Sequence, residues 1–164
     1  MSFTHIETQA SDTNSNSGAA SLTNPVSVGD LLIGIALTVN DSDLSLLTVQ
    51  AGYVLAGALE ENTRTVAVYY KEAVGGEDTF TVESSDTDEE VGASISRYSK
   101  TGSVGVIASV SGMATNDTSI TVGPVATEPG ALLFAAMRGG SSDNFGDFTQ
   151  RLPSPPAYVG NAPY

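Results

Sequence analysis

One apolar run, residues 28–39, constrains the fold of this chain more than any other feature. It reads Val-Gly-Asp-Leu-Leu-Ile-Gly-Ile-Ala-Leu-Thr-Val, and it carries no charge from Leu31 to Leu37. A transmembrane helix needs about 20 apolar residues, so the run is too short to cross a membrane. Its β-branched and aliphatic residues, with the small Gly34 among them, favour a strand that is covered on both faces.

A second run of the same character lies near the other end of the chain. Residues 130–137 read Gly-Ala-Leu-Leu-Phe-Ala-Ala-Met and match Gly-Asp-Leu-Leu-Ile-Gly-Ile-Ala at residues 29–36 in character, position by position. Two interpretations stay open. The runs are quasi-equivalent strands of one fold, or they coincide because the sequence is rich in Leu, Ala and Gly.

The remaining apolar segments are short and alternate with turn-forming residues, a pattern that indicates strands rather than helices. Gly52 and Gly57 interrupt the segment 46–59, in which Tyr53 and Val54 are expected in the core. Residues 65–71 fit a central antiparallel strand, and Val91, Ala93 and Ile95 are expected on one face of theirs. The expected strands lie within residues 3–8, 19–22, 28–39, 46–59, 65–71, 79–83, 91–98, 104–110, 118–122, 130–137 and 145–152.

These strands predict an all-β domain over residues 1–150, a two-sheet antiparallel β-sandwich with a jelly-roll-like topology. Residues 151–164 contain four prolines, too many for the interior of a sheet. We therefore expect an extended, proline-rich C-terminal arm that is partly polyproline II.

The charge balance excludes some partners. The chain has 164 residues, with 19 Asp and Glu against six Lys and Arg, and a net charge of −13. Such a surface repels nucleic acid and anionic membranes, so neither is expected as a partner. The chain contains no cysteine, and its first residues lack the basic and apolar regions of a signal peptide. We therefore expect synthesis in a cytoplasm without a signal peptide.

The residues needed for catalysis are sparse. His5 is the one histidine, whereas hydrolytic triads and most zinc sites need a histidine held by neighbours. The acidic residues occur in turn-like clusters without the apolar setting that would separate two carboxyl pKa values. The chain also has no tryptophan to stack on a sugar. We therefore expect no enzymatic activity and no catalytic residues.

Calcium is the one cofactor that the acidic loops suggest. Asp86, Asp88 and Glu90 offer oxygen ligands at alternate positions. An EF-hand loop counted from Asp86 would need Gly and Glu at its sixth and twelfth positions, which hold Val91 and Arg97 instead. A solvated acidic turn is therefore the favoured interpretation, with calcium as the minority alternative, and we expect no cofactor.

Two groups of residues are candidates for subunit contacts. Tyr69 and Tyr70 are adjacent on an expected strand and so must face opposite ways, and the outward one is the better interface candidate. In the arm, prolines reduce the entropy lost on docking, and apolar side chains could serve as anchors. The arm candidates are Pro155, Pro156, Tyr158, Val159 and Tyr164. A neighbouring subunit is the expected site of docking, and folding back onto the same domain is the alternative.

Four segments together resemble the small β-sandwich proteins of tailed-bacteriophage virions. They are Val-Gly-Asp-Leu-Leu-Ile-Gly-Ile-Ala from residue 28, Ala-Gly-Tyr-Val-Leu-Ala-Gly from residue 51, Thr-Val-Ala-Val-Tyr-Tyr-Lys-Glu-Ala from residue 65 and Ile-Ser-Arg-Tyr from residue 95. The resemblance covers residues 26–137, with Tyr53 where the family usually has tryptophan.

The resemblance implies a capsid decoration (cement) protein or a tail-associated module without catalytic residues. The leading expectation is a structural protein on the outer capsid surface of the virion, binding the major capsid protein and itself, most simply as a homotrimer. The alternative is a receptor- or glycan-binding module of a tail fibre or adhesin.

Overall fold

The computed structural model describes residues 3–11, 15–38, 43–61 and 64–102, together with Leu132. Eight strands and one short 3₁₀ helix account for most of these residues. They are β1 (Phe3–Ala10), β2 (Ser17–Ser21), β3 (Leu31–Thr38), η1 (Leu44–Leu46), β4 (Leu47–Val49), β5 (Val54–Glu61), β6 (Arg64–Glu72), β7 (Thr79–Ser84) and β8 (Val91–Lys100).

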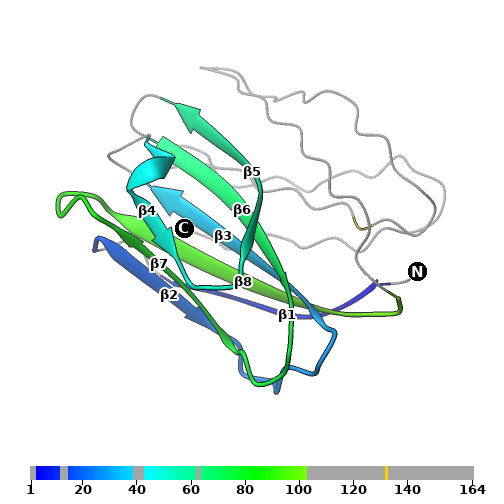
Figure 1. Cartoon of the computed structure of the whole chain (residues 1–164). Helices are drawn as coiled ribbons and strands as arrows, with labels where there is room; N and C mark the ends of the chain where they lie inside the picture. The colour runs from blue at the N-terminus through cyan, green and yellow to red at the C-terminus, as the bar shows by residue number, and fades with distance from the viewer. Residues whose placement is uncertain (1–2, 12–14, 39–42, 62–63, 103–131, 133–164) are drawn as a thin grey trace, which may run out of the picture.

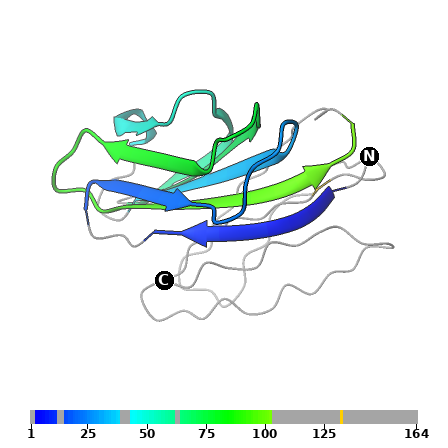
Figure 2. The ribbon, with the colours of Figure 1, turned by 90° about the horizontal axis from the view of Figure 1, so that it is seen from below.

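The strands form two layers, which Figure 1 shows face-on and Figure 2 shows from the side. The five-stranded sheet has the order β1-β8-β3-β6-β5, and the three-stranded sheet has the order β2-β7-β4. All pairings are antiparallel. The expected two-sheet antiparallel sandwich is therefore confirmed.

The strand pairs are nested in the manner of a jelly roll. β1 pairs with β8 and β3 with β6 in the large sheet, while β2 pairs with β7 in the small sheet. Successive pairs thus alternate between the layers as the chain winds inwards. β5 departs from this pattern, because it pairs with β6 and widens the large sheet instead of joining β4.

β3 lies at the centre of the large sheet and is covered on both faces, as its unbroken apolar run predicts. Seven of its eight residues are buried. The strand begins at Leu31 rather than at residue 28, because Val28 and Gly29 form a turn in which Gly29 has a φ of 85°. A positive φ of this size is one that glycine adopts without strain.

The inner face of the large sheet, which is turned towards the small sheet, forms the main core. Leu32, Ala36, Ala67 and Ile95 pack there in one cluster with Phe80 of the small sheet. Expected strand faces are confirmed here, since Val91, Ala93 and Ile95 all belong to this cluster.

Gly34 allows the two sheets to approach closely at this point. A Cβ atom added at Gly34 would lie 2.5 Å from Phe80 Cε2, closer than real side chains pack. The glycine that keeps one position of β3 small therefore makes room for the aromatic ring of β7.

The outer face of the large sheet, which is turned away from the small sheet, is also apolar. Leu31, Ile33 and Tyr98 form a second buried cluster there, and further hydrophobic residues pack against it. We call the whole group the outer cluster: Leu31, Ile33 and Tyr98 with Phe3, Val68, Tyr70 and Leu132.

Some boundaries and one core assignment differ from expectation. β2 begins at Ser17, before the expected segment 19–22, and β5 continues to Glu61, beyond the expected segment 46–59. Val54 is 51% exposed, so its assignment to the core is wrong. It lies opposite Tyr70 on the edge strand β5, where no further strand of the described part of the chain covers it. The strands expected at 104–110, 118–122, 130–137 (except Leu132) and 145–152, and the arm at 151–164, lie outside the described residues.

Candidate functional site

One end of the sandwich is held by a buried ion pair between Asp30, which immediately precedes β3, and Arg97 on the inner face of β8. Arg97 Nε donates to Asp30 Oδ2 at 2.7 Å, and the backbone N–H of Ser27 donates to the same oxygen at 2.9 Å. Both side chains are about nine-tenths buried, at 10% and 8% exposure. The backbone of Ala73 closes the arrangement, since its N–H donates to the carbonyl of Asp30.

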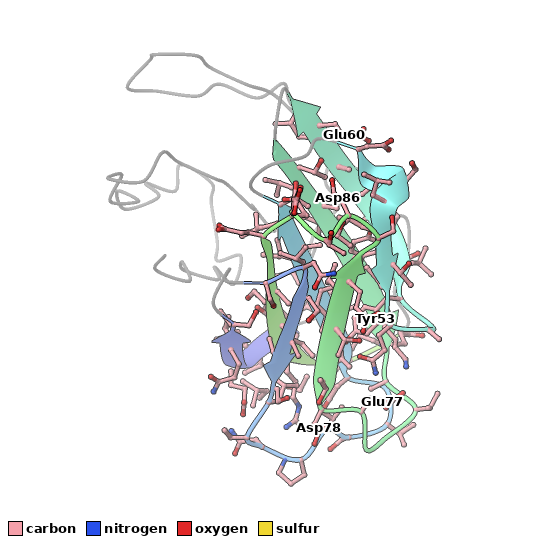
Figure 3. The ribbon with its side chains drawn as sticks, turned by 90° about the vertical axis from the view of Figure 1, so that its left-hand side faces the viewer. Tyr53, Glu60, Glu77, Asp78 and Asp86 are labelled. Atoms are coloured by element: carbon pink, nitrogen blue, oxygen red, sulfur yellow. The ribbon has the colours of Figure 1, made fainter. Side chains whose placement is uncertain are left out.

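A second group, Tyr53, Lys71 and Glu77, lies at the same end. Lys71 Nζ is 5.7 Å from the centre of the Tyr53 ring and 3.1 Å from Glu77 Oε1. The Tyr53 ring packs edge-on against Phe80, with centroids 4.8 Å apart. Figure 3 shows Tyr53 and Glu77 in the same half of the molecule. An ammonium group between a ring face and a carboxylate is held by both charge and the ring quadrupole.

The turn that precedes β7 is organised by the Glu77 carboxylate. It accepts the backbone N–H of Val74 at 3.1 Å and that of Gly75 at 2.7 Å. Partial burial opposes its ionisation, but the hydrogen bonds from Val74 and Lys71 outweigh this and hold the pKa of Glu77 below its usual range. The pKa of Tyr53 is raised by burial and by the nearby Glu77 charge. Both pKa shifts are explained by burial and by neighbouring groups within the fold.

Four residues of these two groups belong to the four segments that carry the resemblance to virion proteins, and Glu77 lies outside them. Asp30 comes from Gly-Asp-Leu-Leu, Tyr53 from Gly-Tyr, Lys71 from Tyr-Tyr-Lys and Arg97 from Ile-Ser-Arg-Tyr. The fold brings Asp30 to Arg97 and Tyr53 to Lys71. These contacts connect turns to strands, so their chemical role is structural.

Apart from Ile6 on β1, the large apolar side chains that are exposed among the described residues lie in two places. Val28 and Val74 are 77% and 75% exposed, on the turns before β3 and after β6. The two turns are adjacent, because Gly29 N–H donates to the Ala73 carbonyl at 2.8 Å. Val54 and Leu55, at 51% and 44%, are exposed at the start of the edge strand β5. In the sequence, the only indication of these exposed sites is that Val28 and Val74 each stand next to a glycine-containing turn.

The two tyrosines expected to face opposite ways do so. Tyr69 is 7% exposed and lies in the inner core, with its ring centre 6.0 Å from that of Phe80. It therefore serves the core of its own domain rather than an interface. Tyr70 is the outward one, and it packs against the outer cluster. The arm candidates Pro155, Pro156, Tyr158, Val159 and Tyr164 lie outside the described residues.

The acidic residues are distributed rather than gathered. Figure 3 shows Glu60 and Asp86 towards one end of the sandwich and Glu77 and Asp78 towards the other. In the acidic loop considered for calcium, Asp86 Oδ1 accepts the backbone N–H of Asp88 at 2.9 Å, as in a local turn. Among the described residues no three His, Cys, Asp or Glu side chains are grouped as metal ligands.

His5 lies on β1, at the rim of the outer face. Its Nε2 atom is 2.9 Å from Thr8 Oγ1, and its ring centre is 5.3 Å from that of Tyr98. Thr8 Oγ1 is in turn 2.9 Å from Ser96 Oγ. This chain of contacts joins β1 to β8, which is a structural use of the histidine. Within the described segments no helix is long and apolar enough to span a bilayer.

Comparison of the chain with protein-family models, with curated proteins and with solved structures returned no match.

Proposed function

We propose that this protein is a non-enzymatic structural protein of a bacteriophage virion, a decoration protein that binds the major capsid protein on the outer surface of the head. The observation that carries the proposal is the meeting of Asp30 with Arg97 and of Tyr53 with Lys71. These residues come from the segments that resemble virion β-sandwich proteins. Their contacts make the four segments parts of one folded unit.

The surface of the protein supports the same role. A net charge of −13 keeps an outward-facing surface soluble and disfavours contact with packaged nucleic acid. Val28 and Val74 are exposed apolar side chains on adjacent turns, and exposed apolar residues in proximity are typical of protein contacts. We take this end of the sandwich as the surface that touches the capsid.

The proposal includes assembly as a homotrimer on the particle, with the arm at residues 151–164 lying across a neighbouring subunit. Native mass measurement of the free protein and of protein released from particles tests the trimer. A monomer in both states would remove this part of the proposal while leaving capsid binding to be judged separately.

The test of capsid binding uses purified virions and emptied, expanded shells. The protein should co-purify with intact particles and rebind shells from which it has been stripped. Val28→Ser combined with Val74→Ser should weaken rebinding at least tenfold, about 1.4 kcal/mol. Val54→Ser is the matched control, because it removes an exposed valine from β5, and it should rebind normally.

Absence of the protein from purified virions would overturn the proposal. Saturable binding of the isolated protein to host cells or to a glycan array would favour the alternative, a receptor-binding module of a tail fibre or adhesin. Normal rebinding by the double valine variant would move the capsid contact elsewhere on the protein.

A further inference from the structure

The outer face of the large sheet is buried, although the small sheet lies on the opposite side. Leu31, Ile33 and Leu37 are 5–6% exposed, and Tyr98 is fully buried. Neighbouring positions on β3 and β8 face the small sheet, so these side chains need a different cover. A sheet with two apolar faces requires a layer on each of them.

The cover comes from the same chain. The exposed fractions of Leu31 and Tyr98 are those of a single copy, so no second molecule contributes to their burial. All members of the outer cluster but one belong to the five strands of the large sheet. The exception is Leu132, which packs against the cluster from beyond β8.

Leu132 belongs to one of the two similar apolar runs of the sequence. It is the first leucine of Gly-Ala-Leu-Leu-Phe-Ala-Ala-Met, the run that matches the β3 sequence in character. This run is apolar throughout, and the chain between Gly102 and residue 130 is long enough to return from the end of β8 to any point on the face. A charged or proline-rich segment would be a poor cover for Leu31 and Ile33.

We propose that residues 130–137 dock on the outer face of the large sheet and form its cover, in contact with the outer cluster. The two similar apolar runs are then packing partners on either side of one interface. Tyr70 contributes to this internal interface, and the face is closed to external partners. Contacts with other proteins must use other surfaces, such as the turns of Val28 and Val74.

Disulfide trapping in the full-length chain tests this arrangement, and the absence of native cysteine makes the experiment clean. Leu132→Cys is combined in turn with Phe3→Cys, Leu31→Cys or Val68→Cys, which are outer-cluster positions on three different strands. The matched control combines Leu132→Cys with Leu32→Cys, the neighbour of Leu31 that faces the small sheet. Thermal unfolding followed by circular dichroism identifies the variants that fold.

We expect at least one outer pair to form an intramolecular disulfide under mild oxidation, at least tenfold faster than the control pair. Disulfides form only when the two Cα atoms lie within about 7 Å, so the trapped pair locates the segment. The proposal is overturned if no outer pair forms a disulfide in folded protein, if the Leu32 pair reacts equally fast, or if the product is a crosslinked dimer. The dimer would assign the cover to a second copy.

Discussion

On the inner face of the large sheet, Gly34 leaves a space that the Phe80 ring fills, and a buried Asp30–Arg97 pair closes one end. On the outer face, Leu31, Ile33 and Tyr98 form a cluster without a comparable interlock in the described residues. The corresponding ion pair at the outer side, Lys100 with Glu72, leaves the glutamate 47% exposed. The inner face therefore depends on particular shapes and charges, whereas the outer face depends on apolar area.

The ion pairs should show the largest difference between the two faces. Asp30→Ala leaves the Arg97 guanidinium buried without its carboxylate, and we expect the free energy of unfolding to fall by about 3–5 kcal/mol. Glu72→Ala, at the partly exposed pair on the outer side, should cost about 1 kcal/mol or less. Urea unfolding of both variants measures the difference. Similar losses for the two would contradict the distinction drawn between the faces.

Shape sensitivity should be the next largest effect. Gly34→Ala places a Cβ atom against the Phe80 ring, so we expect a loss of about 1–3 kcal/mol. Phe80→Leu in the same chain should recover part of that loss, because the leucine side chain leaves the space free. Ile33→Val on the outer face should cost only about 0.5–1.5 kcal/mol. If the losses in the free energy of unfolding caused by Phe80→Leu and Gly34→Ala are additive in the double variant, the two residues do not compete for space.

Alkaline pH should affect buried tyrosines on both faces, and Tyr53 and Tyr98 test one face each. Burial raises the pKa of Tyr98, and burial with the Glu77 charge raises that of Tyr53. Above about pH 10 the unfolded chain releases these protons and the folded chain retains them, so stability is intact below that pH and falls above it. Tyr53→Phe and Tyr98→Phe should each reduce the fall measured by urea unfolding between pH 9 and about pH 11. An unchanged pH dependence in both variants would contradict the assigned burial.

Alternation and turn residues predict most strands of the described part of the chain, but the segment 46–59 divides into β4 and β5, which lie in different sheets. The cleanest cases are β7, with its period-two pattern, and β3, with its unbroken apolar run. The opposite directions of Tyr69 and Tyr70 follow from the same periodicity. Strand order was not predictable from the sequence, because the pairing of β1 with β8 joins residues that are far apart in the chain.

The candidate site was less predictable than the fold. Asp30 and Arg97 were read as parts of two motifs, and nothing in their spacing indicates that they form a buried pair. Val54 was assigned to the core because valine is apolar, but an edge strand leaves one of its sides without a neighbour. The exposure of Val28 and Val74 depends on two turns that only the folded chain brings together.

Thiol labelling of the folded full-length protein tests the central claim, that the outer face is covered by the protein's own chain. Single variants Ile33→Cys and Val28→Cys are labelled with a maleimide over a range of protein concentrations. We predict that the thiol at position 33 reacts at least 100-fold more slowly than the thiol at position 28, and that dilution does not change the ratio. That ratio corresponds to about 2.7 kcal/mol of protection. Equal reactivity, or protection that disappears on dilution, would contradict the claim.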